Sequence, residues 1–139
     1  EPEPFEELGN GLNLGWIIEL DEKVFSDNIA IKLKQIFDCE YVRASRIARK
    51  GISRIAFCSG SGGSMLELAK QKKCDALITG DVKHDVWIDA NANDIVVFDC
   101  GHFHTENPVL WELRRVLEER FPQLDVEISE RSVDPVIYF

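Results

Sequence analysis

Three short apolar runs, each about the length of one β-strand, alternate with helical patterns in the second half of this sequence. The runs are residues 54–58, 75–79 and 95–99, and amphipathic helical spacing occupies residues 64–72 and 84–91 between them. Buried strands separated by helices indicate parallel pairing, with helices on both faces of the sheet. The alternation therefore predicts a three-layer α/β fold with a largely parallel mixed sheet in the middle.

Weaker patterns extend this prediction along the rest of the chain. Residues 1–13 are acidic and rich in Pro, Gly and Asn, so we expect a flexible lead-in, followed by a single α/β domain over residues 14–139. A helix is expected over residues 26–38, and the longest helical pattern covers residues 107–121, with apolar residues along one side. Further strands are expected at residues 14–20, 41–44, 125–129 and 136–139.

Length, charge and cysteine content narrow the class of protein. A chain of 139 residues with a net charge of −9 fits one domain and disfavours nucleic-acid binding, which depends on basic side chains. None of the four cysteines forms a Cys-x-x-Cys pair, and the simplest interpretation is a reducing, cytoplasmic location. The sequence has no signal-peptide pattern and no apolar stretch near the length of about 20 residues that a membrane helix requires, so no membrane association is expected.

Polar, glycine-bearing segments follow each of the three apolar runs. They are residues 59–64, 80–85 and 101–106, and together they contain all three histidines of the chain. In open α/β sheets, ligands bind beyond the carboxyl ends of the parallel strands. We therefore expect these three loops to share one rim of the sheet and to carry the functional site.

The first loop is a candidate substrate-binding segment through Ser61, Gly62 and Gly63. Glycines allow backbone N–H groups to point at a phosphate or carboxylate, and the N-terminus of the following helix adds partial positive charge. The loop is neither a Walker A motif nor a dinucleotide-binding fingerprint. The alternative is a tight strand-to-helix turn that requires small residues.

The second loop contributes two candidate catalytic residues, Asp81 and His84. Asp81 could bind metal, act as a base or cap the following helix, which is the commonest role of an aspartate there. His84 could transfer protons, or it could be a surface residue of the loop.

The third loop contains the best candidates for metal ligands, His102 and Glu106. Imidazole and carboxylate are good ligands for Zn²⁺, Mn²⁺ or Fe²⁺, and the four-residue spacing can direct both to one point. In the alternative interpretation, Thr105 caps the next helix, Glu106 is an acidic residue of its first turn, and His102 is an ordinary loop histidine. His104 is expected to point elsewhere.

Four motifs, in order and correctly spaced, resemble the C-terminal half of the NIF-three-like proteins, whose bacterial members are named type 2 GTP cyclohydrolase I homologues. Gly-Trp-Ile-Ile-Glu-Leu at residues 15–20 resembles the family pattern Gly-x-Gly-x-Ile-Gly-Glu-Leu, and Gly-Ser-Gly at residues 60–62 resembles its glycine turn. The segments at residues 79–84 and 101–106 match closely. The chain departs from the family pattern at Trp16, at Ile18 and at Asp85, where a second histidine often stands.

The resemblance implies one half of a fold of two intertwined α/β repeats, assembled as a homo-oligomer in a ring-shaped hexamer. It also implies a dinuclear site for divalent ions such as Zn, Mn or Fe, in which His102 and Glu106 would be two of the ligands. The other ligands belong to the N-terminal half of the family fold, so the site is expected to be incomplete in this chain.

Three functional hypotheses follow from these observations. The first is a metal-dependent hydrolase of a nucleotide-like or phosphorylated small molecule, with His102 and Glu106 as metal ligands and Asp81 or His84 transferring protons. The second is a non-catalytic metal-binding or assembly domain that needs the N-terminal half or another subunit. The third is an anion- or nucleotide-binding module at residues 59–64.

Overall fold

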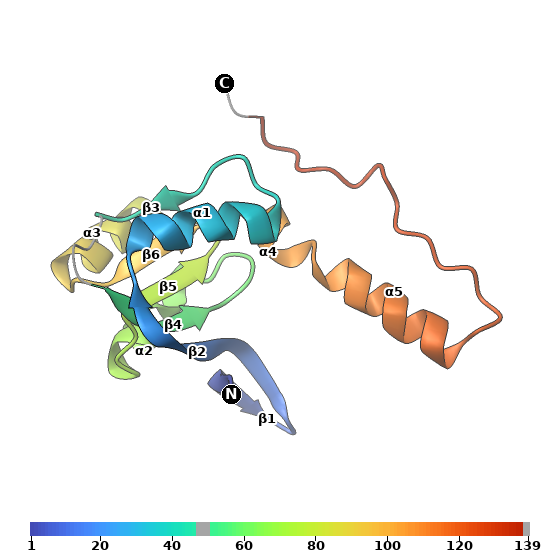
Figure 1. Ribbon diagram of the computed structural model, residues 1–139, viewed down its shortest axis with the longest axis horizontal. Coiled ribbons are helices and arrows are strands. Elements are labelled where there is room, and N and C mark those ends of the chain that lie inside the picture. The colour runs from blue at the N-terminus through green and yellow to red at the C-terminus, as the bar shows by residue number, and fades with distance from the viewer. Residues whose placement is uncertain (47–50, 138–139) are drawn as a thin grey trace.

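The computed structural model describes residues 1–46 and 51–137 and contains a six-stranded mixed sheet with the strand order β1-β2-β4-β5-β6-β3 (Figure 1). The strands are β1 (Glu3–Gly9), β2 (Leu12–Val24), β3 (Arg43–Ala44), β4 (Ile52–Phe57), β5 (Ala76–Thr79) and β6 (Val96–Asp99). The helices are α1 (Ser26–Phe37), the 3₁₀ turn η1 (Gly63–Met65), α2 (Leu66–Gln71), α3 (His84–Ala92), α4 (His102–Glu106) and α5 (Val109–Arg120). The predicted mixed α/β fold class is therefore confirmed.

Strands β4, β5 and β6 form the parallel centre of the sheet. The β5 strand pairs with β4 and β6 in parallel, and every residue of β5 and β6 is buried. Continuous burial of this kind is typical of parallel strands that are covered on both faces. The pairs β1–β2, β2–β4 and β3–β6 are antiparallel, so the sheet is mixed and its parallel part is confined to the centre.

Alternate side chains of the central strands face two separate hydrophobic cores. Leu77 and Val97 pack in the core that includes Leu66 of α2 and Ala90 of α3. The side chains of the opposite face join Ile29 and Leu33 of α1 in the second core, with Ala76, Ile78, Val96 and Phe98. Because successive residues of a strand point to opposite faces, short apolar strands without alternation require helices on both sides, as predicted.

The N-terminal segment is a strand, and the prediction of a flexible lead-in over residues 1–13 is wrong. Strand β1 pairs antiparallel with β2, from Glu3↔Ile17 to Gly9↔Leu12, and Phe5 is fully buried. The hairpin turns through Gly9, Asn10 and Gly11, all of which have positive φ. Asn-Gly is a typical hairpin signal. The acidic composition of residues 1–13 concealed this signal, because Phe5 is the one buried residue of the strand.

The C-terminal part of the chain differs most from prediction. The helix predicted over residues 107–121 forms as α5, but no residue of α5 is buried, and a separate short helix, α4, precedes it. The strand predicted at residues 125–129 does not form, because this segment runs beside α5 and away from any sheet edge (Figure 1). Residues 136–137 are not a strand either, and residues 138–139 lie outside the described residues.

No helix in the described part of the chain combines the length and the hydrophobicity that a bilayer-crossing helix requires.

Asp99, at the end of β6, connects the last two strand-end loops to the sheet. The side chain is 3% exposed; Oδ2 accepts a hydrogen bond from Val82 N (2.9 Å) and Oδ1 accepts one from Gly101 N (2.9 Å). The guanidinium of Arg43, on β3, forms an ion pair with the same carboxylate. One buried carboxylate therefore fixes the positions of both loops.

Replacing Asp99 by alanine should lower the free energy of unfolding by about 2–4 kcal/mol, because two backbone N–H groups lose their acceptor. Urea denaturation of Asp99→Ala measures the loss. Asp89→Ala, at an exposed position of α3, is the matched control and should change stability by less than about 0.5 kcal/mol. Equal stability of the two variants would contradict the anchoring role of Asp99.

Candidate functional site

The three strand-end loops lie against one another at one rim of the sheet, which confirms the predicted convergence. The carbonyl oxygen of Gly60 accepts hydrogen bonds from Gly80 N (2.8 Å) and Thr79 Oγ1 (3.1 Å), and Gly60 N donates to Thr105 Oγ1 (2.9 Å). A Cβ atom on Gly80 would lie 2.7 Å from the backbone of Gly101, so only glycine permits this approach. The loops therefore form one hydrogen-bonded unit.

His102 and Glu106 converge on one point at this rim. They are one helical turn apart in α4, and His102 Nε2 lies 3.2 Å from Glu106 Oε2. The side chains are 45% and 53% exposed. Because residues four apart share one side of a helix, both groups can reach the same ligand from solvent.

Asp81 contacts the other ring nitrogen of His102, with Oδ2 2.9 Å from Nδ1. Asp81 has a left-handed backbone (φ +51°), and the residue that precedes α3 as its N-cap is Lys83, so a helix-capping role of Asp81 is wrong. A carboxylate beside Nδ1 favours the tautomer that carries the proton on Nδ1. That tautomer leaves the lone pair of Nε2 directed toward Glu106.

These residues fit part of a divalent-metal site. An imidazole nitrogen and a carboxylate oxygen are suitable ligands, and a carboxylate that holds the second ring nitrogen is the usual support of a metal-binding histidine. Among the residues that the structure describes, however, no group of three or more His, Cys, Asp or Glu side chains could hold a metal ion. The chain thus offers a ligand pair rather than a closed site.

His84 lies apart from this pair. It is the first residue of α3, it is exposed, and its side chain makes no hydrogen bond or ion pair with the described residues. The structure therefore brings Asp81 to His102 but does not bring His84 to either of them.

In the glycine loop (residues 59–64), two backbone N–H groups are already hydrogen-bonded to other residues of the protein. Gly62 N donates to Thr79 Oγ1 (2.8 Å), and the amide of Gly60 is bonded to Thr105. Ser61 is exposed and Gly63 is half-buried at the start of η1. A Cβ on Gly62 would lie 2.5 Å from Thr79 Oγ1, so the tight turn accounts for this glycine.

The thiol nearest the loops is not activated for nucleophilic chemistry. Burial, together with the charge of Glu6, raises the pKa of Cys58. Burial also raises the pKa of Cys100, to about 12. Since thiolates are the reactive form, neither cysteine is a candidate nucleophile at neutral pH.

The remaining residues of α4 have structural roles. Thr105 does not cap a helix: it is buried within α4, and its hydroxyl contacts Gly101 O and His102 O (both 3.0 Å). His104 points away from the pair, as expected, and its Nε2 lies 3.2 Å from Asp134 Oδ2 in the C-terminal segment.

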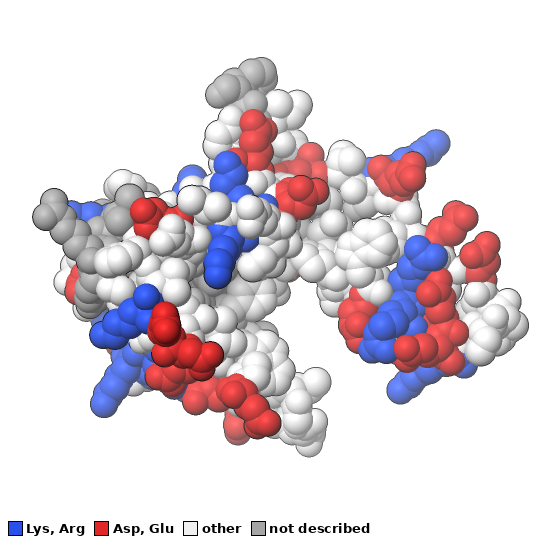
Figure 2. Space-filling model, in the orientation of Figure 1, with Lys and Arg blue, Asp and Glu red and all other residues white. Residues whose placement is uncertain are grey.

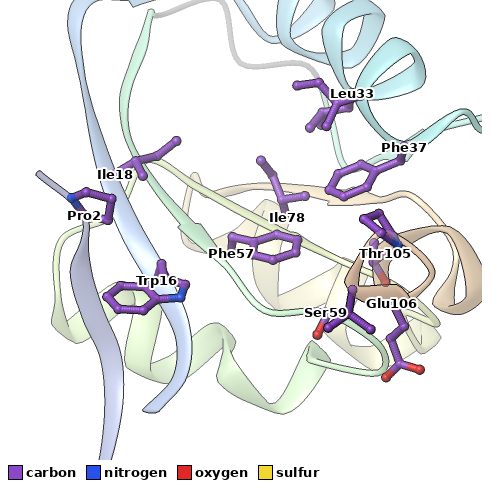
Figure 3. A pocket seen from close by; sticks show the side chains of 13 residues that line it. Pro2, Trp16, Ile18, Leu33, Phe37, Phe57, Ser59, Ile78, Thr105 and Glu106 are labelled. Carbon is purple, nitrogen blue, oxygen red and sulfur yellow. The ribbon is translucent and has the colours of Figure 1, made fainter. Parts of the chain in front are cut away.

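An apolar groove of about 1060 Å³ adjoins the ligand pair, and the sequence pattern did not predict it. Figure 3 shows Ile18, Phe57 and Ile78 along the groove and Glu106 at one end. The phenyl rings of Phe37 and Phe57 stack there at 5.8 Å. The exposed apolar residues Trp16 and Ile18, where the sequence departs from the family pattern, were the available signal.

Comparison with known proteins decides the family. The family model for Duf34/NIF3 (NGG1p interacting factor 3) matches residues 2–135. The chain belongs to the Duf34/NIF3 family. A relative from Pyrococcus horikoshii named GTP cyclohydrolase 1 type 2 homolog is 36% identical over 119 residues, which are 86% of this chain and 47% of the relative. NIF3-like protein 1 of Dictyostelium discoideum is 33% identical over 93% of this chain and 37% of its own length.

Solved structures share the fold. Staphylococcus aureus protein SA1388 superposes with a TM-score of 0.83 at 29% identity, covering 91% of this chain and 37% of that one. A Bacillus cereus protein related to NIF3 gives 0.79 at 25% identity, covering 94% and 37%. The chain thus spans about half, or less, of the length of these Duf34/NIF3 relatives.

Gly60 should tolerate no side chain without movement of the ligand pair. A Cβ there would lie 2.4 Å from Glu106 Oε1, and φ is +64°. Gly60→Ala should lose about 1–2 kcal/mol of stability from the backbone alone and should also shift the imidazole resonances of His102 in NMR spectra.

Gly11→Ala is the matched control, because Gly11 has φ +75° but no atom within 4 Å of the added Cβ. It should have a similar backbone cost and leave the His102 resonances unchanged. Unchanged His102 resonances in Gly60→Ala would contradict the close contact between the glycine loop and α4.

Proposed function

We propose that this chain provides a ligand pair, His102 and Glu106, to a divalent-metal site of a metal-dependent hydrolase. The observation that carries the proposal is the 3.2 Å approach of His102 Nε2 to Glu106 Oε2, with Nδ1 of the same ring held by Asp81. The half-exposed position of both groups at the rim of the parallel strands supports it, since ligands of α/β sheets bind there.

The side chains would act in different ways. Glu106 presents a carboxylate oxygen and His102 a ring nitrogen to the same ion. Asp81 accepts a hydrogen bond from Nδ1–H of His102, which orients the ring and makes Nε2 a better electron-pair donor. When bound, the ion would supply Lewis-acid stabilisation of negative charge that develops on the substrate. His84, exposed on the next helix, is the remaining candidate for proton transfer.

The proposed substrate is a nucleotide-like or phosphorylated small molecule. The names of several relatives, GTP cyclohydrolase 1 type 2 homolog, motivate this choice. A phosphate-bearing ligand also suits a site in which a metal ion provides positive charge, because the chain itself is acidic. Ser61 and Gly63, in the loop whose Gly60 contacts α4, are the proposed substrate contacts of residues 59–64.

A second candidate is a non-catalytic metal-binding or assembly domain. Two observations favour it. The described residues offer no set of three metal ligands, and the chain spans 47% of the Pyrococcus horikoshii relative. Under this proposal, further ligands would come from another chain or segment, and the pair alone would bind metal without turnover.

Metal affinity tests the ligand assignment. His102→Ala and Glu106→Ala should each weaken Zn²⁺ or Mn²⁺ binding in calorimetric titrations by at least about tenfold, because each removes one ligand. Asp81→Asn should weaken binding by about 10- to 100-fold, because the ring loses its orienting carboxylate.

His104→Ala is the matched control, since it removes an imidazole from the same helix without touching the pair. It should bind metal as the unmodified chain does. If all four variants bind equally, the ion is held elsewhere and the proposal fails.

Turnover separates the two candidate functions. With Zn²⁺ or Mn²⁺ and GTP, a hydrolase should release product at a rate that Glu106→Gln reduces by at least about 100-fold. Chromatography of the nucleotide measures the rate. Metal binding without any turnover above the metal-only rate would favour the non-catalytic domain and would exclude hydrolysis of GTP by this chain alone.

A further inference from the structure

Asp81 reaches His102 from an uncommon backbone conformation. Its φ is +51°, in the left-handed region that residues other than glycine rarely adopt. Its side chain is 58% exposed, and within the described part of the chain its carboxylate is hydrogen-bonded to His102 alone. The contact between the two side chains therefore depends on the groups that hold the backbone of Asp81 in this conformation.

The peptide groups on both sides of Asp81 are hydrogen-bonded. On one side, Gly80 N donates to Gly60 O (2.8 Å). On the other side, Val82 N donates to Asp99 Oδ2 (2.9 Å), and the side chain of Val82 is buried in a hydrophobic core. The carboxylate of Asp99 thus fixes the peptide group that directly follows Asp81.

Arg43 binds the same oxygen of Asp99 from the edge of the sheet. The two residues lie directly opposite each other on β3 and β6, and the Arg43 guanidinium forms its ion pair with Oδ2. The guanidinium also lies over the Trp87 ring of α3, 5.7 Å from the ring centroid, which favours one position of the cation. Because the Asp99 side chain is only 2% exposed, its charge depends on this partner and on the two backbone N–H groups that donate to it.

We propose that Arg43 is a positioning residue for the ligand pair, which acts through Asp99 and the backbone of Asp81. Without the guanidinium, the buried carboxylate would lose its counter-charge and would turn toward water, releasing Val82 N. Asp81 would then leave the left-handed region and separate from Nδ1 of His102. The effect on metal binding rests on the proposed function, whereas the effect on the orientation of the imidazole does not.

An ordinary surface ion pair would not have this effect. In α5, Arg115 pairs with Glu112 and Glu119, all of which are more than half exposed, and Figure 2 shows acidic and basic side chains mixed over this helix. Such pairs contribute little, because water can replace either partner. The ion pair of Arg43 differs because its partner, Asp99, is buried and holds two loops of the candidate site.

The tautomer of His102 tests the proposal in the metal-free chain. In buffer with chelator at about pH 8.5, where imidazoles are ordinarily neutral, ¹⁵N NMR spectra distinguish ring nitrogens with and without a proton, and His102→Ala identifies the His102 signals. The unmodified chain should carry the proton mainly on Nδ1. Arg43→Met keeps the length of the side chain without its charge. It should lower the ratio of the Nδ1–H form to the Nε2–H form by at least about fivefold, the effect of one lost hydrogen bond.

Two further variants separate positioning from general stability. Arg43→Lys keeps the cation and should hold the ratio within about twofold of the unmodified chain, because the ion pair runs through one guanidinium nitrogen that an ammonium can replace. Arg54→Met is the matched control, since it removes ion pairs with Glu3 and Glu19 among β1, β2 and β4. It should lower the urea midpoint of unfolding but leave the His102 tautomer unchanged.

The outcomes that would overturn the proposal are distinct from those that bear on metal binding. An unmodified chain with the proton on Nε2, an unchanged tautomer in Arg43→Met, a shifted tautomer in Arg43→Lys, or an equal shift in Arg54→Met would each overturn it. Calorimetric titration with Zn²⁺ tests the functional consequence, and Arg43→Met should bind about tenfold more weakly. A shifted tautomer with unchanged Zn²⁺ affinity would uphold the positioning role and contradict the proposed metal site.

Discussion

A small set of buried hydrogen bonds holds the three strand-end loops together at one rim of the sheet, and the rest of the candidate site depends on it. Gly60 is bonded to Thr79, Gly80 and Thr105, and Asp99 binds the backbone of the two later loops. Buried donors and acceptors of this kind are costly to separate, so the three loops keep one arrangement. The position of α4, and with it the ligand pair, follows from these contacts.

The rim combines an ordered support with an accessible pair of side chains. Asp99 and Thr105 are buried, whereas His102, Glu106 and Asp81 are about half exposed. This is a suitable division for a binding site, because the buried groups fix geometry and the exposed groups meet the ligand. The adjoining apolar groove and α5, of which no residue is buried, leave apolar side chains exposed in the same region.

Local sequence signals predicted the centre of the molecule well. The alternation of apolar runs and helices placed β4, β5 and β6 within about two residues, and the expected ends of α1 agree with Ser26–Phe37. The rule that ligands bind at the carboxyl ends of parallel strands correctly predicted that the three loops share one rim. The four-residue spacing correctly predicted that the side chains of His102 and Glu106 approach each other. The errors lie at the ends of the chain. Strand β1 was missed because its burial rests on one residue, Phe5. The helix α5 was predicted, but its pattern did not indicate that its apolar side stays exposed.

The sequence by itself determined which segments are strands and helices in the centre of the fold, and which side chains stand at the strand ends. Hydrophobic periodicity and glycine positions are local properties, so they can be interpreted without the fold. Only the tertiary structure decided that Asp81 holds His102, that His84 stands apart, and that the apolar side of α5 stays exposed. These outcomes depend on the distances between segments that are remote from one another in the sequence. A periodic pattern shows which side of a helix is apolar, but it does not show which surface that side contacts.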